Sequence, residues 1–143
     1  MSAPLLARLM LTAVAAGQGI TPLFIDLNKT HATNPLWPGH ARFHVVWQTF
    51  SANMACAIEV GLIWWPSPQS GALFYLAALF TSIPMCGFML ALVTLRTYKG
   101  TLHDANGIQP LRMHLAGKLR EIDMNAVLVI IGVAVLMFAT TIF

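Results

Sequence analysis

The amino-acid sequence predicts an all-α protein, an integral membrane bundle of four helices, on three observations. Only 9% of the 143 residues are charged, whereas ordinary soluble domains carry about 25%. The chain is 57% hydrophobic, with a mean hydropathy of +0.71. Four of its segments approach the roughly 20 apolar residues that a helix needs to cross a bilayer. So few charges exclude a soluble globule or a disordered chain, and the net charge of +3 favours an anionic lipid surface over nucleic acid.

The four predicted spans all lie in one transmembrane domain that covers residues 1–143. They contain residues 5–25, 43–65, 71–95 and 126–143. No span alternates with period two, and backbone in lipid must satisfy its hydrogen bonds within the segment, so each span is expected to be helical. The first span begins like a signal peptide, with Arg8, an apolar run and small residues at 13–15, but we expect it to stay uncleaved as a helix.

Lysine and arginine residues predict how the spans are oriented. The connection at 26–42 holds Lys29 and Arg42, the connection at 66–70 holds none, and the connection at 96–122 holds five. Because positively charged connections stay in the cytoplasm, we expect the first and third connections inside the cell and both termini outside, in a bacterial inner membrane. The two cysteines lie in apolar spans and are too few for a disulfide framework.

The long third connection has two features of its own. Residues 103–107 read HDANG, and Asn-Gly is a strong turn signal. Further on, Leu111, Leu115 and Leu119 recur at helical spacing, which predicts a short amphipathic helix over residues 111–122. We expect this helix to lie in the membrane interface with its cations toward the headgroups, or else to continue the fourth span into the cytoplasm.

Reactive side chains are most dense between the first two spans, from residue 26 to residue 48. Two helices need only a few turn residues to connect them, so this density exceeds what a connection requires. We take Asp26, His40 and His44 as candidate catalytic residues. The candidate ligand-binding residues are His31, Asn34, Trp37, Arg42, Trp47 and Gln48.

Helical geometry gathers several polar side chains on one face of the second span. Pro38 favours a helix start at that point, since proline fits the first turn. At about 100° per residue, five polar side chains then fall within an arc of about 100°. Such a polar strip on an apolar helix is expected to face other helices or a cavity, because polar groups are costly in lipid. The polar strip consists of His40, His44, Gln48, Ser51 and Glu59.

Glu59 is the one carboxylate in the interior of any predicted span. An ionisable residue inside the membrane is by default a functional candidate, and we include Glu59 among the catalytic residues. No cation is expected at its depth, so Glu59 should hold a proton or share one with Gln18, Thr81 or Ser82. A neutral glutamic acid that clamps two helices together is the structural alternative.

Three kinds of function fit this cluster, and the first is cofactor-free acid–base chemistry. An isomerase or hydrolase of this kind would act on a sterol, terpenoid or lipid that enters from the bilayer. The sequence carries no nucleotide loop, no GxSxG elbow and no dinucleotide fingerprint. Asn34 and Gln48 would orient the polar end of the molecule. The apolar wall would come from Trp37, Phe43, Trp47 and Phe50.

The second function is metal binding, and the third is non-catalytic. His40 and His44 are spaced so that two imidazoles reach one divalent ion, with Asp26 or His31 as a third ligand. Because HxxxH alone is a weak pattern, our default expectation is no metal and no other cofactor. In the third function, the protein is an accessory subunit of a larger membrane complex and the cluster seals a helix–loop–helix corner. A transporter would require a homo-oligomer.

The segment from Asn34 to His44 reads NPLWPGHARFH. It resembles the NP-x-W-x-x-HARFH motif of a family of small four-span membrane proteins from bacteria and fungi, and Asp26, His31 and Gln48 fit the same pattern. The rest of the chain matches that family only in its four spans. The resemblance implies the four-span fold and no particular activity.

The chain also resembles, more loosely, the four-span fold of sterol isomerases and sigma-2-type receptors. The resemblance lies in size, in the number of spans and in a buried acid. Those proteins hold acidic and histidine residues in a bundle cavity that takes a sterol-like ligand. The similarity implies a lipophilic ligand close to the second span, where Glu59 and His44 lie.

Overall fold

The protein folds into four long helices and one small two-stranded hairpin. The computed structural model describes residues 1–115 and 117–143. The elements are α1 (Ala3–Ile25), α2 (Gly39–Trp64), α3 (Ser70–Thr94), β1 (Leu111–Leu115), β2 (Lys118–Ile122) and α4 (Met124–Ile142). Each helix begins and ends within about one helical turn of its predicted boundary, so the all-α prediction is confirmed for the bundle.

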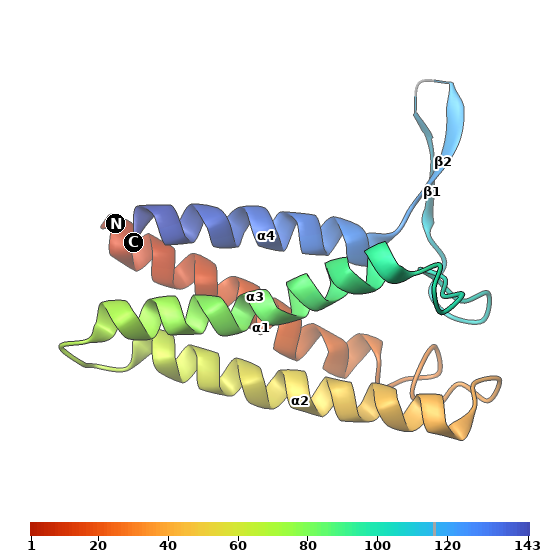
Figure 1. Cartoon of the computed structure of the whole chain (residues 1–143), viewed down its shortest axis with the longest axis horizontal. Coiled ribbons are helices and arrows are strands. Elements are labelled where there is room, and N and C mark those ends of the chain that lie inside the picture. Colours follow the sequence, from red (N-terminus) through yellow and green to blue (C-terminus); the bar gives the residue numbers. More distant parts are fainter. Residues whose placement is uncertain (116) are drawn as a thin grey trace.

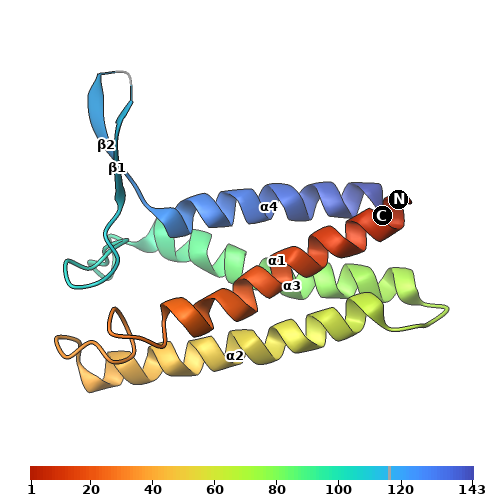
Figure 2. The same cartoon turned by 180° about the vertical axis from the view of Figure 1, so that it is seen from behind.

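The helices run up and down, so the connections gather at two ends. Both termini lie at the same end as the short connection between α2 and α3 (Figure 1). The first and third connections meet at the other end, as the reverse view also shows (Figure 2). This arrangement matches the predicted grouping of the cation-rich connections on one side.

Three of the four helices are long and apolar enough to cross a membrane by length and composition, namely α1, α3 and α4. Among the described residues α2 does not join them, although it has 26 residues. Its polar strip lowers its hydropathy without shortening it. Three of the four predicted spans are therefore supported, and the span predicted over residues 43–65, which corresponds to α2, stays a prediction.

Helix α1 packs against both α2 and α4 and forms the centre of the bundle. Its buried face repeats every fourth residue, at Ala7, Leu11, Ala15 and Gly19. A Cβ at Gly19 would collide with the Cβ of Cys56 and meet the carbonyl oxygen of Ala52, so glycine lets α1 approach α2 closely. Small residues at such an interface are typical of helices that associate in lipid.

The end of the bundle that holds the termini is fastened by Arg8. Its guanidinium donates a hydrogen bond to the carbonyl of Ile63 and lies 6.0 Å from the centre of the Trp64 ring and 5.4 Å from that of Phe143. Arg8 therefore joins α1 to the end of α2 and to the C-terminus. The sequence carries no signal for this role, because the partners of Arg8 are far apart along the chain.

The prediction of a helix over residues 111–122 is wrong, whether at the interface or as a continuation of α4. Strands β1 and β2 pair antiparallel there, and Gly117, which directly precedes β2, has a φ of +74°. Glycine adopts this left-handed backbone without strain. Leu111, Met113 and Leu115 also alternate with period two, so a short apolar run of this kind fits a strand as well as a helix.

Candidate functional site

A groove of about 870 Å³ lies between α2 and α3, with α1 behind it. The two helices lie side by side near their short connection and separate toward the other end, where the second half of α3 turns away from α2 (Figure 1). Pro84 lies in that half of α3 and lines the groove. Four of the five residues of the polar strip line it, namely His44, Gln48, Ser51 and Glu59, opposite Phe80, Ile83 and Phe88 of α3.

At the end of the groove nearest the connection between α2 and α3, Thr81 links Glu59 to Gln18. Glu59 is 5% exposed and Thr81 is fully buried. The Thr81 hydroxyl lies 2.9 Å from Glu59 Oε2, and Gln18 Nε2 donates to the Thr81 carbonyl at 3.1 Å. Three helices thus share one buried polar junction. Of the three partners expected for Glu59, Thr81 is confirmed, whereas Gln18 reaches the backbone of Thr81 and the Ser82 hydroxyl bonds within its own helix.

The hydrogen bonds of Thr81 bear on the proton of Glu59. The Thr81 hydroxyl has two oxygen neighbours at 2.9 Å, Glu59 Oε2 and the carbonyl of Ala77. A hydroxyl has one proton to donate and two lone pairs to accept with. A protonated Glu59 satisfies both contacts, because it donates to Thr81 while Thr81 donates to Ala77. The geometry therefore agrees with the predicted neutral or proton-sharing carboxyl group.

At the other end of the groove, near the start of α2, His44 pairs with His40. The two Nε2 atoms are 3.0 Å apart, and the rings meet edge to face with their centres separated by 4.5 Å. At this distance one nitrogen donates and the other accepts, so a neutral pair shares a single proton. His44 is half-buried and lines the groove, whereas His40 is exposed and is not among the lining residues.

His44 and Glu59 cannot act on the same atom. They are separated by about 22 Å along the axis of α2, at about 1.5 Å per residue. A general acid and a general base must each reach the reacting group within hydrogen-bond distance. The polar strip therefore gives the groove two chemically separate ends.

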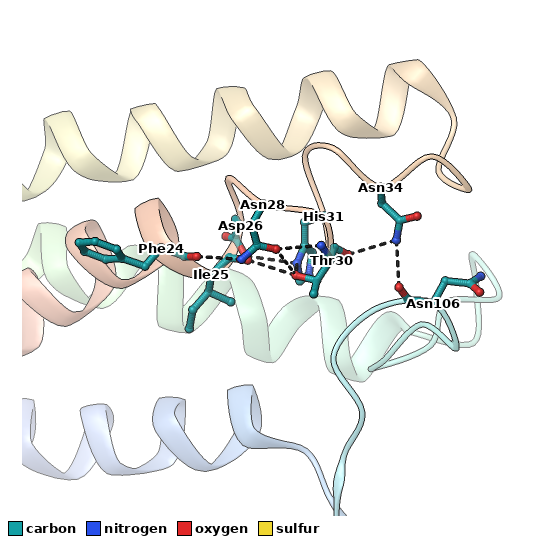
Figure 3. Close-up of polar contacts among 8 residues, drawn as sticks. All are labelled: Phe24, Ile25, Asp26, Asn28, Thr30, His31, Asn34 and Asn106. Carbon is teal, nitrogen blue, oxygen red and sulfur yellow. Dashed lines mark hydrogen bonds and ion pairs between the residues drawn. The ribbon is translucent and has the colours of Figure 1, made fainter.

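Asp26 and His31 lie in the first connection, and neither lines the groove. His31 Nδ1 lies 3.9 Å from Asp26 Oδ1 and 2.8 Å from the Thr30 hydroxyl (Figure 3). Because the Thr30 hydroxyl donates to Asn28 Oδ1 at 2.7 Å, His31 Nδ1 must be the donor to Thr30. Burial raises the pKa of Asp26, and the nearby His31 partly offsets that rise. These side chains satisfy one another within the connection.

Asn34 is almost completely buried, with 2% of its surface exposed. Its side-chain nitrogen donates to the carbonyl of Thr30 at 3.3 Å and to that of Asn106 at 3.0 Å (Figure 3). Its side-chain oxygen accepts from the backbone of Leu36. Asn34 thus fastens the first connection to the third. Sequence spacing gives no signal for this contact, since its partners are remote along the chain.

The remaining candidate residues divide between the connection and the groove. The Trp37 ring meets His31 edge to face, with centres 5.0 Å apart. Trp37 Nε1 and Arg42 Nε are buried without a hydrogen-bond partner among the described residues. Trp47 and Gln48 line the groove. The connection therefore holds its own polar network, while α2 supplies the groove.

Metal ligands are sparse in the part of the chain that the structure describes. No three His, Cys, Asp or Glu side chains gather there closely enough to hold an ion. Asp26 and His31 pair with each other, so the pair of His40 and His44 has no third protein ligand from that source. No protein-family model, curated protein or solved structure matches the chain significantly.

Proposed function

We propose that this protein crosses the membrane four times and binds an elongated lipophilic molecule, such as a sterol, terpenoid or lipid, in the groove between α2 and α3. The observation that carries the proposal is the groove itself, which combines the polar strip of α2 with an apolar wall on α3. Helix α2 is about 39 Å long at about 1.5 Å per residue, enough for a hydrocarbon core of about 30 Å. Of the polar side chains that lower its hydropathy, Glu59 is buried and His44 is half-buried, whereas Gln48 and Ser51 are exposed where they line the groove.

The groove suits a long molecule with a polar end. Its volume of about 870 Å³ lies within the usual range for small-molecule sites. Between His44 and Glu59 the α3 side is apolar, with Phe80, Ile83 and Phe88. A lipophilic molecule would enter sideways from the bilayer, place its polar group against His44 and extend toward Glu59.

The pair of His40 and His44 supports proton transfer at that polar end. A neutral imidazole takes a proton from an acidic carbon of the bound molecule and returns it at another carbon, which is an isomerisation that needs no cofactor. His40 would act through His44, because the two share one proton across 3.0 Å. Hydrolysis would need a water molecule in addition, so isomerisation is the simpler chemistry.

Filling the groove tests the binding proposal. A Cβ at Gly87, which lines the groove, would meet nothing within 4 Å, and the same holds for Gly61, which lies on α2 outside the lining. Gly87→Phe should block the groove without disturbing the fold, and Gly61→Phe is the matched control. We expect wild-type and Gly61→Phe protein, purified in mild detergent, to retain one lipophilic molecule that mass spectrometry of the extract identifies, and Gly87→Phe to lose it.

The proposal fails if all three proteins carry the same mixture of bulk lipids.

A second pair of variants separates binding from chemistry. His44→Gln is compared with His103→Gln in the exposed third connection, which is the control. We expect the His44 variant to retain the molecule and to lose its conversion when the molecule is added back to reconstituted protein. A defined complex with other chains and an empty groove would instead support the accessory-subunit alternative.

Metal binding by the histidine pair is a second candidate. With metal–nitrogen bonds of about 2.0–2.1 Å, two ligands at about 90° lie about 2.9 Å apart. The two Nε2 atoms are 3.0 Å apart. Titration with Cu(II), followed by electron paramagnetic resonance, should show two nitrogen ligands that His40→Gln reduces to one. A Cu(II) spectrum that His40→Gln leaves unchanged would remove this candidate.

A further inference from the structure

The hairpin of β1 and β2 stands away from the four helices. In both views it runs crosswise to the helix axes, at the end where the first and third connections meet and on the side of α4 (Figures 1 and 2). An element crosswise to membrane-spanning helices, at the end of the bundle, runs along the membrane surface. This step rests on the four-span part of the proposed function and is independent of the groove.

The two faces of the hairpin differ in charge. Directly paired residues point to the same side of a two-stranded sheet, and successive residues alternate. Leu111 pairs with Ile122, and Met113 pairs with Arg120. One face, the apolar–basic face, therefore carries Leu111, Met113, Lys118, Arg120 and Ile122; the opposite face carries Arg112, His114, Leu119 and Glu121.

Only the apolar–basic face has unbalanced positive charge. Lys118 and Arg120 share it with no acidic residue. On the opposite face Arg112 pairs with Glu121 at 3.1 Å. Leu111 and Met113 are 49% and 41% exposed, so the apolar part of the face is uncovered in the folded chain. Among the described residues, neither Lys118 nor Arg120 makes an ion pair. Exposed apolar side chains beside such cations complement a membrane surface, which has anionic headgroups outside and hydrocarbon beneath.

We propose that the apolar–basic face docks on the anionic lipid headgroups of the leaflet that surrounds the bundle. Leu111 and Met113 enter the headgroup region, and the cations of Lys118 and Arg120 reach phosphate groups while their stems stay apolar. The hairpin then acts as a lipid-binding arm beside α4. Docking depends on the lipid charge, which separates it from simple burial of apolar surface.

Adjacent residues on opposite faces provide the test. In a Cys86→Ser background, the polarity-sensitive fluorophore NBD is attached to Met113→Cys or, as the matched control, to His114→Cys. The full-length protein is reconstituted in nanodiscs of phosphatidylcholine alone or with phosphatidylglycerol. We expect a blue-shifted and several-fold brighter emission at position 113 in anionic discs, water-like emission at position 114, and loss of the difference in Lys118→Glu/Arg120→Glu protein.

Equal emission at the two positions, or emission at position 113 that ignores lipid charge, would overturn the proposal. Brightening in neutral discs that grows with the number of protein copies per disc would assign the face to a second copy and overturn it as well. Extraction of membranes at alkaline pH distinguishes failure of hairpin docking from failure of the proposed four-span arrangement. A chain that remains in the pellet still spans the membrane even when its hairpin does not bind lipid.

Discussion

Helices α2 and α4 belong to one bundle but hold their polar side chains in different ways. The two threonine hydroxyls near the end of α4, Thr140 and Thr141, donate to carbonyls of their own helix. The polar side chains of α2 instead line a groove, and Glu59 contacts Thr81 of α3. Helix α4 thus satisfies these hydroxyls within itself, whereas α2 buries Glu59 against α3 and leaves Gln48 and Ser51 exposed in the groove.

This difference predicts where a substitution lowers the stability of the bundle most. In the four-span arrangement that we propose, a substitution on the outer face of α4 changes contacts with lipid tails, which are as apolar as the side chains themselves. A substitution where α2 meets α1 or α3 changes contacts that nothing else can replace. The predictions below compare matched positions on the two sides of the bundle, beginning with the largest expected effect.

The closest helix contact should be the most sensitive. Gly19→Ala forces a methyl group against the Cβ of Cys56 and the backbone of α2, and we expect it to lower stability by about 3 kcal/mol. Gly132→Ala of α4 meets the Cε of Met85 at 2.7 Å, the mobile end of a flexible side chain, so a smaller loss is expected. Thermal unfolding of both variants in detergent checks the order. Equal losses would mean that α1 and α2 are not packed through Gly19.

The buried polar junction gives the next effect. Thr81→Val leaves the Glu59 carboxyl group without its hydroxyl partner, and we expect a loss of about 1–2 kcal/mol. Thr140→Val removes a hydroxyl that bonds only to its own helix, and we expect a change within about 0.5 kcal/mol. Unfolding by denaturing detergent measures both variants. A Thr81 variant as stable as the Thr140 variant would show that the junction contributes nothing.

The smallest effect concerns pH and the first connection. Burial raises the pKa of Asp26 above 3.8, so the folded protein binds this proton more tightly than the unfolded chain does. The stability that Asp26 contributes is therefore complete below pH 3.8 and is lost as the pH rises through its folded-state pKa. Compared with Asp26→Asn, wild-type protein should lose a little stability as the pH rises above 3.8. Parallel melting temperatures across that range would contradict this assignment.

The sequence was sufficient for the helices and for the composition of the polar strip. Long apolar segments set the helix boundaries, and the spacing of His44, Gln48, Ser51 and Glu59 put them on one face, which lines the groove. The turn predicted from Asn106-Gly107 is also confirmed, since the backbone nitrogen of Gly107 donates to the Asp104 carbonyl at 3.0 Å. These features depend on local spacing, which a sequence displays directly.

Features that depend on distant partners could not be predicted. Asn34 was assigned to a ligand, but its partner Asn106 lies across the bundle end in another connection. Arg8 was counted only as a charge, and its contacts with Ile63 and Phe143 were missed. The hairpin was missed because Leu111, Met113 and Leu115 fit two periods, and only the strand pairing decides between them.

The most direct test of the central claim is saturable photolabelling. A sterol and an isoprenoid that each carry a diazirine are photolysed in turn with protein in nanodiscs, with and without excess unlabelled competitor, and the adducts are located by mass spectrometry. If the polar strip of α2 faces a binding groove, at least one probe should give competitor-sensitive adducts confined to residues 15–18 of α1, 44–59 of α2 and 80–91 of α3. Adducts from both probes that ignore competitor and spread along α4 would contradict the account.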